Sequence, residues 1–425
     1  MNPKSDSTHA FEPSPEYLAR EKRVMDVVAL KKPDRVPVAT FAHSFMTRCE
    51  GLTEAQSLYD FDKTREAYKA TTRRFDFDMA PPILTRLPGK AMALMGLNTF
   101  KWPGFNQDDD IPYQFVEAEH MRAEEYDAFL QDPGDFTVRK MWPRLAKIFE
   151  PLAMFPPLYS ATSGYNTWTH LGLFAGMPAF QKMLKTMLAV GEEMNRYMAF
   201  QTRTITELAR MGYPTLCTAV SHAPFDWLSD YFRGLKGTMF DMYRMPDKMK
   251  AATERLLPML VEGGIIQARM SGNPRVFIPL HRGSDAFMSD AMFKEFYWPG
   301  LKSLLLAIID AGLTPMPWFE GKYTDRLKYL AELPPGKVMG HFDIVDKKKF
   351  KEICGDVMCF YGDIPPSLLI TGNPQQVKDY VKGLIDMFGD TGTLIIDGAV
   401  EGIPVQARPE NVEAMMQTVS EHGIY

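Results

Sequence analysis

The sequence predicts an α/β protein built as a (β/α)8 TIM barrel, with an N-terminal extension and a long insertion after the first strand. Three observations support this fold class. Short apolar runs alternate with long helical stretches along the chain, a pattern typical of parallel strands joined by right-handed crossovers. There are eight such runs, the number that closes a barrel. Polar residues gather after most of the runs, on the side where barrel enzymes carry their active sites.

The eight predicted strands are residues 79–84, 157–162, 215–220, 276–280, 314–319, 337–341, 357–361 and 393–396. Helical spacing of apolar residues predicts helices over 181–211, 246–271, 290–311 and 374–388. Earlier in the chain, two helical stretches, 16–30 and 53–75, flank a β-like run at 36–41. We therefore expect residues 1–75 to form an extension whose helices pack on the barrel, and residues 76–425 to form the barrel itself.

Residues 87–156 form an oversized connection between the first two predicted strands. They include an expected helix at 117–130 and many aromatic residues. A long insertion on a barrel usually covers the catalytic mouth, so a lid or a partner-contact surface is the favoured interpretation. A surface excursion without a role is the alternative.

The composition of the chain argues against some classes of binding partner and indicates a cellular location. The chain has 425 residues, of which 45% are hydrophobic and 24% charged, as in ordinary globular proteins. A net charge of -5 without a polybasic block argues against nucleic acid. No apolar run reaches the ~18 residues of a membrane span. Four scattered cysteines and an N-terminus without an apolar core predict a reducing, cytoplasmic location.

Two neighbouring predicted strands end in residues able to bind a metal. Glu320 ends the fifth strand, and His341, followed by Asp343, ends the sixth. An unpaired buried carboxylate is very costly, so Glu320 requires a partner. A metal ion is one possibility, and Arg282 or Lys322 is the other.

Further candidates for substrate binding follow the other strands. They are His222, His281, Trp318, Tyr361 and Asp363, with Phe225, Phe319 and Trp168 as additional aromatic walls. Each has a structural alternative. The two histidines are often simply hydrogen-bonded, and aromatic residues near strands commonly belong to the core. Asp226 and Asp285 precede helical stretches and could cap them, while Asp363 and Asp397 lie beside glycines in turn-like settings.

Two motifs at opposite ends of the chain resemble one superfamily. Residues 32–38, KPDRVPV, are similar to the opening of the uroporphyrinogen decarboxylase superfamily, and residues 403–412, IPVQARPENV, resemble its closing segment. The resemblance covers nearly the whole chain after about residue 18. It implies a (β/α)8 barrel, in agreement with the strand count. The superfamily contains true decarboxylases and zinc-dependent methyltransferases that work with corrinoid proteins.

Departures from the motifs of the better-known enzymes of this superfamily indicate which of its branches the chain resembles. Residues 41–48 lack the Arg-rich motif of the decarboxylases, and the cysteines of the thiol methyltransferases are missing. Glu320 and His341 have the spacing found in the methyltransferase components of anaerobic phenyl methyl ether O-demethylases. A further glutamate of that branch falls on Leu305 here. Glu401 is our substitute for it as third metal ligand, on position alone, and Asp343 and Asp363 are rivals.

The resemblance therefore implies a zinc-dependent methyltransferase of anaerobic metabolism. The enzyme would take a methyl group from a methoxylated aromatic substrate and transfer it to the Co(I) corrinoid (cobalamin) of a separate corrinoid protein. Zn2+ would act as a Lewis acid on the ether oxygen, with Glu320 and His341 as its catalytic ligands. The alternative is a metal-free, uroporphyrinogen decarboxylase-like lyase acting on a small carboxylated substrate. A third class is a non-catalytic corrinoid-binding protein, but the chain lacks the Asp-x-His-x-x-Gly signature of that class.

Overall fold

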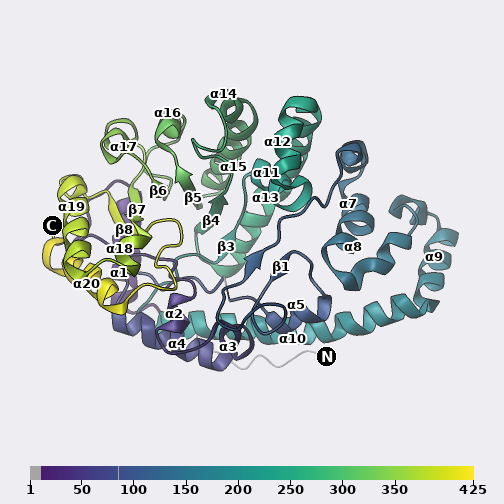
Figure 1. Cartoon of the computed structure of the whole chain (residues 1–425), viewed down its shortest axis with the longest axis horizontal. Helices are drawn as coiled ribbons and strands as arrows, with labels where there is room; N and C mark the ends of the chain where they lie inside the picture. Colours follow the sequence, from purple (N-terminus) through teal and green to yellow (C-terminus); the bar gives the residue numbers. More distant parts are fainter. Residues whose placement is uncertain (1–10, 85) are drawn as a thin grey trace.

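Six parallel strands lie side by side in sequence order and form the main sheet of the molecule (Figure 1). The computed structural model of the chain describes residues 11–84 and 86–425. The strands of this sheet are β3 (Ala219–Val220), β4 (Arg275–Leu280), β5 (Thr314–Lys322), β6 (His341–Ile344), β7 (Phe360–Ile364) and β8 (Leu394–Gly398). A separate antiparallel pair, β1 (Phe100–Lys101) and β2 (Gln114–Phe115), belongs to the insertion.

Two further extended segments close this sheet into a ring. The closing contacts are three parallel bridges, Val38 with Ile396, Ala39 with Met79 and Ala80 with Thr215. The segment at 38–39 therefore joins β8 to the segment at 79–80, which in turn joins the chain just before β3. Eight parallel staves result, so the predicted barrel is confirmed.

One predicted strand is wrong. Residues 157–162 form a 3-10 turn, Leu158–Thr162, with no buried residue, and the missing stave is the β-like run at 36–41. Two consecutive prolines, Pro156 and Pro157, lack the N–H groups that a central strand must donate. The long insertion does follow the stave at 79–80, but that stave is second in the ring. The first strand of the barrel therefore lies within residues 1–75, which were expected to form only an extension. The predicted domain limits stay a prediction.

Ten α-helices in the described ranges precede β3, and the last two of them, α9 and α10, form a long arm. They are α1 (Pro15–Val28), α2 (Phe45–Arg48), α3 (Glu54–Tyr59), α4 (Phe61–Phe75), α5 (Gly89–Met95), α6 (Tyr126–Gln131), α7 (Pro133–Phe136), α8 (Trp142–Leu145), α9 (Gly164–Gly176) and α10 (Pro178–Arg210). The helix expected at 117–130 is confined to α6. Figure 1 shows α10 running from the barrel to α9 at the far end of the molecule.

The later helices alternate with strands as expected. They are α11 (Pro224–Leu228), α12 (Gly234–Arg244), α13 (Pro246–Ser271), α14 (Asp290–Met292), α15 (Trp298–Asp310), α16 (Leu327–Leu330), α17 (Lys347–Cys354), α18 (Pro366–Ile370), α19 (Pro374–Phe388) and α20 (Pro409–His422). The predicted helices 246–271 and 374–388 coincide with α13 and α19. Asn373 and Gln376 form a capping box at the start of α19, which is why sequence locates this end well. No helix in the described ranges is both long and apolar enough to cross a membrane.

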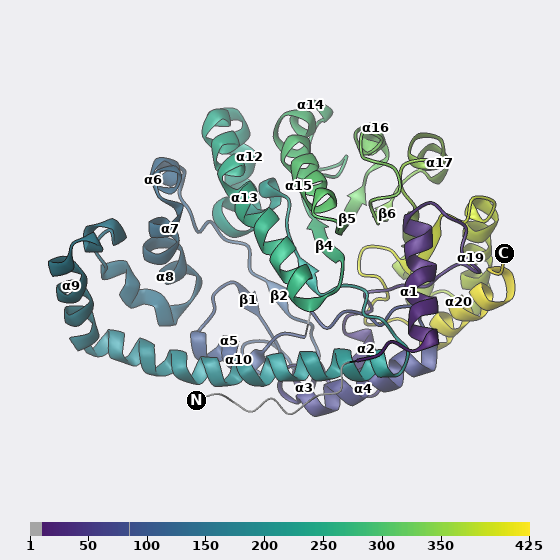
Figure 2. The same cartoon turned by 180° about the vertical axis from the view of Figure 1, so that it is seen from behind.

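The interior of the barrel is filled by one cluster of buried side chains, including Met316, Trp318, Met339, Cys359, Tyr361 and Ile395. Val24, Val27 and Val28 of α1 belong to the same cluster. Helix α1 therefore closes the N-terminal end of the barrel, and Figure 2 shows it lying across that side. The opposite, C-terminal end is left for a functional site, as the barrel rule predicts.

Candidate active site

Four charged side chains meet where β3, β4 and β5 end. Helix α11 begins at Pro224 directly after β3, since proline suits the first turn of a helix. It carries Asp226, and Asp230 follows one turn later, so both face the same side. His281 comes directly after β4, and Glu320 lies near the end of β5.

Asp226 and Asp230 hold the segment that leaves β4. Asp226 is fully buried and accepts hydrogen bonds from the backbone N–H groups of His281 (3.2 Å) and Arg282 (3.1 Å) and from the Tyr297 hydroxyl (2.6 Å). It does not cap α11, whose cap is Ala223, so the interpretation of Asp226 as a helix cap is wrong. Asp230 binds the Arg282 guanidinium at 3.0 Å.

His281 lies between two carboxylates. Its Nδ1 is 2.5 Å from Asp230 Oδ2, and its Nε2 is 3.6 Å from Glu320 Oε1. The His281 and Glu320 side chains are 33% and 30% exposed, so both can be reached by a small molecule. A carboxylate that orients a histidine toward a reacting group is a recurrent arrangement in acid–base catalysis.

The electrostatics of the cluster favour proton donation. Burial lowers the pKa of His281, but the hydrogen bond that its Nδ1 donates to Asp230 and the charges of Glu320 and Asp226 outweigh it and raise that pKa to about 9. Burial raises the pKa of Glu320 to about 7, against the opposing effect of His281. Burial likewise raises the pKa of Asp226 to about 7. Near neutral pH, His281 is therefore protonated and Glu320 carries a proton part of the time.

Aromatic side chains stand beside this cluster. His222, whose pKa burial lowers to about 4, lies 3.4 Å from the Tyr231 hydroxyl and packs edge-on against Trp227. The insertion reaches the same place, since Phe115 of β2 contacts Tyr231 edge-on with ring centroids 5.9 Å apart. Glu117 of the insertion also lies 3.5 Å from Arg282. The mouth thus has flat walls next to a proton donor.

His341 is not at the mouth. It begins β6 instead of ending a strand, because the hydrogen-bonded part of β6 lies further along the chain than predicted. In the parallel register it stands opposite Trp318, on which its ring stacks with centroids 3.3 Å apart. It is fully buried, and its Nε2 lies 3.0 Å from the Gly398 carbonyl oxygen and 3.4 Å from Asp397.

The segment after β8 covers this interior layer. The Trp318 indole donates a hydrogen bond to the Val400 carbonyl at 2.7 Å, and the Tyr361 hydroxyl donates to the Ala39 carbonyl at 3.0 Å. Trp318 and Tyr361, predicted as substrate walls, are therefore the packed top layer of the barrel interior. A substrate at Glu320 would lie above this layer.

The remaining predicted residues are dispersed. Glu401 is exposed and lines a separate hollow of about 310 Å³ with His43 and Arg86. Asp363 lies in β7, where Lys347 contacts it at 2.7 Å and the Tyr380 hydroxyl donates to it at 2.8 Å.

The additional aromatic candidates are equally scattered. Phe225 packs on Tyr297, and Phe319 packs on Phe342 outside the barrel interior. Trp168 lies on α9, far along the arm.

The predicted zinc ligands do not form a set. The Nδ1 atom of His341 has no hydrogen-bond partner within residues 11–84 and 86–425, which leaves a lone pair free. The only side chain found in an ion pair with Glu320 in these ranges, however, is His281 rather than the expected Arg282 or Lys322. Nowhere in the described ranges do three or more His, Cys, Asp or Glu residues gather as metal ligands would. Glu320, His341 and Glu401 thus do not fit a shared metal in this arrangement.

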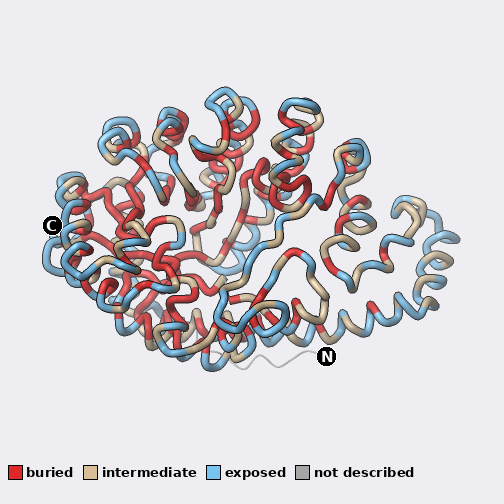
Figure 3. The backbone as a smooth tube through the Cα atoms, in the orientation of Figure 1, coloured by how far each residue is buried: buried red, intermediate tan, exposed pale blue. Residues whose placement is uncertain are grey.

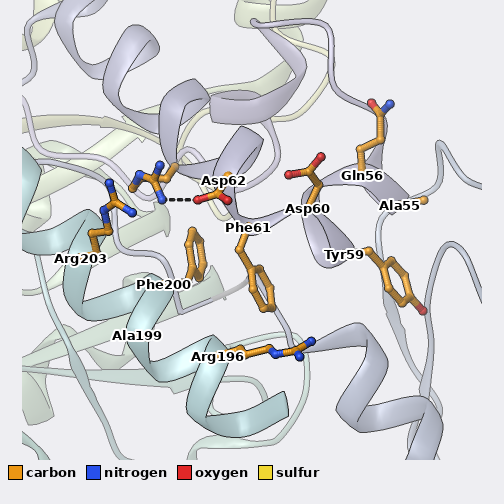
Figure 4. A pocket seen from close by; sticks show the side chains of 11 residues that line it. Ala55, Gln56, Tyr59, Asp60, Phe61, Asp62, Arg196, Ala199, Phe200 and Arg203 are labelled. Carbon is orange, nitrogen blue, oxygen red and sulfur yellow. Dashed lines mark hydrogen bonds and ion pairs between the residues drawn. The ribbon is translucent and has the colours of Figure 1, made fainter. Parts of the chain in front are cut away.

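A different hollow, of about 740 Å³, lies between α3, α4 and α10 (Figure 4). The rings of Phe61 and Phe200 stack there with centroids 4.8 Å apart. Its three arginines are already paired, Arg65 with Asp62, Arg196 with Glu193 and Arg203 with Glu207. Because it is built from the outer helices and its charges are compensated, it is not the candidate active site.

Comparison with known proteins agrees with this architecture. The model of the family "Uroporphyrinogen decarboxylase (URO-D)" matches residues 176–422, more than half of the chain. The chain belongs to the uroporphyrinogen decarboxylase family. A methyltransferase from Methanosarcina mazei has a similar structure, with a TM-score of 0.59 and 14% sequence identity over 95% of this chain and 98% of the other. At that identity the likeness shows the shared barrel fold. No curated protein matches.

Sequence reasoning missed Asp230 and misjudged Asp226. The sequence did contain a usable signal. Asp226 and Asp230 are four residues apart in a helical segment after one strand, so both can face His281, which follows the next strand. The two acids are visible in residues 224–231, PFDWLSDY, as Asp226 and Asp230. Its meaning depends on the two strands being neighbours, which only the barrel establishes.

Proposed function

We propose that this protein is a methyltransferase that demethylates a methoxylated aromatic compound and passes the methyl group to the Co(I) corrinoid of a separate protein. The observation that carries the proposal is the pair formed by Glu320 and His281 at an open, aromatic-walled mouth. Phenolate is a poor leaving group, so an enzyme that breaks an aryl methyl ether must stabilise the departing oxygen. Family membership and a structural neighbour named a methyltransferase support the same reaction class.

The residues at the mouth can supply that stabilisation as a proton. The substrate ring would lie against Tyr231 and Trp227, with the ether oxygen toward Glu320. As the bond between the methyl carbon and the oxygen breaks, its electron pair stays on the oxygen, and Glu320 gives its proton to that oxygen. His281, held by Asp230, then re-protonates Glu320. A corrinoid supplies the nucleophile that accepts the methyl group.

Zinc stays a prediction from the resemblance, and no step above depends on it. The metal-free lyase is less well supported, because such an enzyme needs free arginines for the substrate carboxylates. Arg282 at the mouth already has an acidic partner, Asp230 at 3.0 Å, and Arg86 in the separate hollow beside Glu401 is paired with Glu54 at 3.2 Å.

The test uses the whole chain, a reduced corrinoid protein and a panel of methoxylated aromatics. Formation of methyl-Co(III) is followed by its absorption spectrum, and release of CO2 from carboxylated analogues is measured in parallel. We expect methyl transfer that falls roughly 10²- to 10⁴-fold in Glu320→Gln and in His281→Gln. Glu254→Gln, on the exposed face of α13, is the matched control and should retain the activity.

Two results would contradict the proposal. Release of CO2 without methyl transfer would favour the lyase. Unchanged methyl transfer in Glu320→Gln would show that the reaction is right but the site is wrong.

A further inference from the structure

The arm formed by α9 and the outer half of α10 is unusual in composition. From Pro151 to Gln181 the chain contains no Asp, Glu, Lys or Arg, although Glu150 and Lys182 border the segment. Surface segments of a monomer are normally rich in charged residues. An uncharged surface of this length indicates that something covers it.

Helix α9 is not stabilised by its own chain in the way other helices are. It spans 13 residues, none of them buried. The arm's internal apolar packing includes a three-ring cluster, in which Phe174 stacks on Phe155 with centroids 4.0 Å apart and leans on Phe180. Helices of this length are marginal in water without a packed face. The blue and tan tube of the arm in Figure 3 contrasts with the red barrel.

Large apolar side chains are exposed along the arm. Tyr165 is 80% exposed, Trp168 66% and Leu173 67%. The other exposed large apolar residues of the arm are Met154, Leu158, Tyr159, Leu171, Leu184, Met187 and Leu188. At ~150–250 Å² for a large side chain, these residues present on the order of 1000 Å² of apolar surface. The largest apolar patch on a typical monomer is roughly 300–600 Å², whereas each side of a stable interface buries about 800 Å².

We propose that this arm, residues 151–181 with the adjoining turns of α10, is the interface between two copies of this chain. A second copy brings the same uncharged surface, so a twofold contact buries no unpaired charge on either side. Interfaces of permanent homodimers are correspondingly apolar. A permanent partner also explains how a helix with no buried face persists.

Two other occupants fit less well. A membrane surface selects helices that have Lys and Arg on the polar face, and α9 has neither. The protein that delivers the methyl acceptor must reach the ends of β4 and β5, and Figure 1 shows α9 at the far end of the molecule, away from these central strands. The inference does not depend on the proposed methyl transfer.

The test measures the mass of the full chain in solution by sedimentation or light scattering at micromolar concentration. We expect twice the 48.3 kDa of one chain. Trp168→Asp should weaken the association by at least roughly 30-fold, since aromatic residues at the centre of an interface dominate its affinity. Tyr243→Asp is the control, because Tyr243 is an equally exposed aromatic residue on α12. It should leave the dimer intact.

A second variant guards against misfolding of the first. Leu171→Lys changes the same face, because Leu171 lies three residues after Trp168 on α9, and far-ultraviolet circular dichroism of both variants should match the unaltered protein apart from α9. A monomeric unaltered protein would overturn the proposal, and co-sedimentation of that monomer with phosphatidylglycerol vesicles would assign the arm to a membrane. A dimer that persists in both variants would place the interface elsewhere.

Discussion

The contact between Asp230 and His281 makes a quantitative prediction. Asp230→Asn keeps the shape of the side chain but removes the charge that lies 2.5 Å from Nδ1 of the imidazole. In the unaltered protein the pKa of His281 is raised from 6.5 to about 9, against the lowering effect of burial. The hydrogen bond with Asp230 is the first of the influences that raise it, ahead of the charge of Glu320.

The magnitude follows from this shift. One pKa unit corresponds to 1.36 kcal/mol, so the full shift would be worth ~3.4 kcal/mol in a fully buried site. Because a third of the His281 side chain is exposed, solvent screening reduces this to about 1–2 kcal/mol. A raised histidine pKa stabilises the folded state fully below pH 6.5, and the stabilisation is lost as the pH rises through about 9.

We therefore expect Asp230→Asn to lower the pKa of His281 by roughly 1–2 units. The titration is read from the ring carbon signal of His281 by NMR, assigned with His281→Gln. The free energy of unfolding should drop by about 1–2 kcal/mol more at pH 6 than at pH 10. The loss of the Arg282 contact appears at both pH values and cancels in this difference.

A matched variant separates local from general effects. Asp310→Asn removes an exposed charge at the end of α15 and should leave the titration of His281 unchanged. If Asp230→Asn also leaves that titration unchanged, the two side chains do not interact as the structure places them. The proton-donor assignment would then lose its basis.

Three further outcomes are expected. Methyl transfer should decline as the pH rises through about 7, because the raised pKa of Glu320 sets the point at which its proton is lost, and a flat pH–rate profile between 6 and 8 would contradict its role as acid. Gly398→Ala should lower the midpoint of thermal unfolding by an amount equivalent to at least about 1–3 kcal/mol, since a Cβ there would overlap the Gly402 carbonyl oxygen. Gly383→Ala, in open space on α19, should not. Because no three-ligand set gathers in the described ranges, activity should survive dialysis against a chelator; a loss that added zinc restores would support the zinc mechanism instead.

Much of the fold follows from local signals in the chain. Helices α13 and α19 begin and end where proline, capping residues and helical periodicity place them. The number of staves was also predictable, because alternating strands and helices permit few arrangements. The identity of one stave was not. The runs at 36–41 and 157–162 look alike in sequence, and they differ in whether a neighbouring strand accepts their hydrogen bonds.

The candidate site, too, was predictable from the sequence only in part. The sequence by itself determined that Glu320 would stand at the end of a barrel strand and that His281 would follow the preceding one. It also determined the uncharged composition of the arm, which no fold could alter. Only the tertiary structure decided which side chains meet.

A shift of a few residues in where β6 begins takes His341 from the mouth to the buried layer on Trp318, because strand register fixes height in the barrel as well as direction. The same register brings Asp230 and Glu320 to opposite nitrogens of His281. Three separate strand ends contribute to that meeting. Their closeness is a property of the closed ring, since no local sequence signal specifies the distance between residues so far apart in the chain.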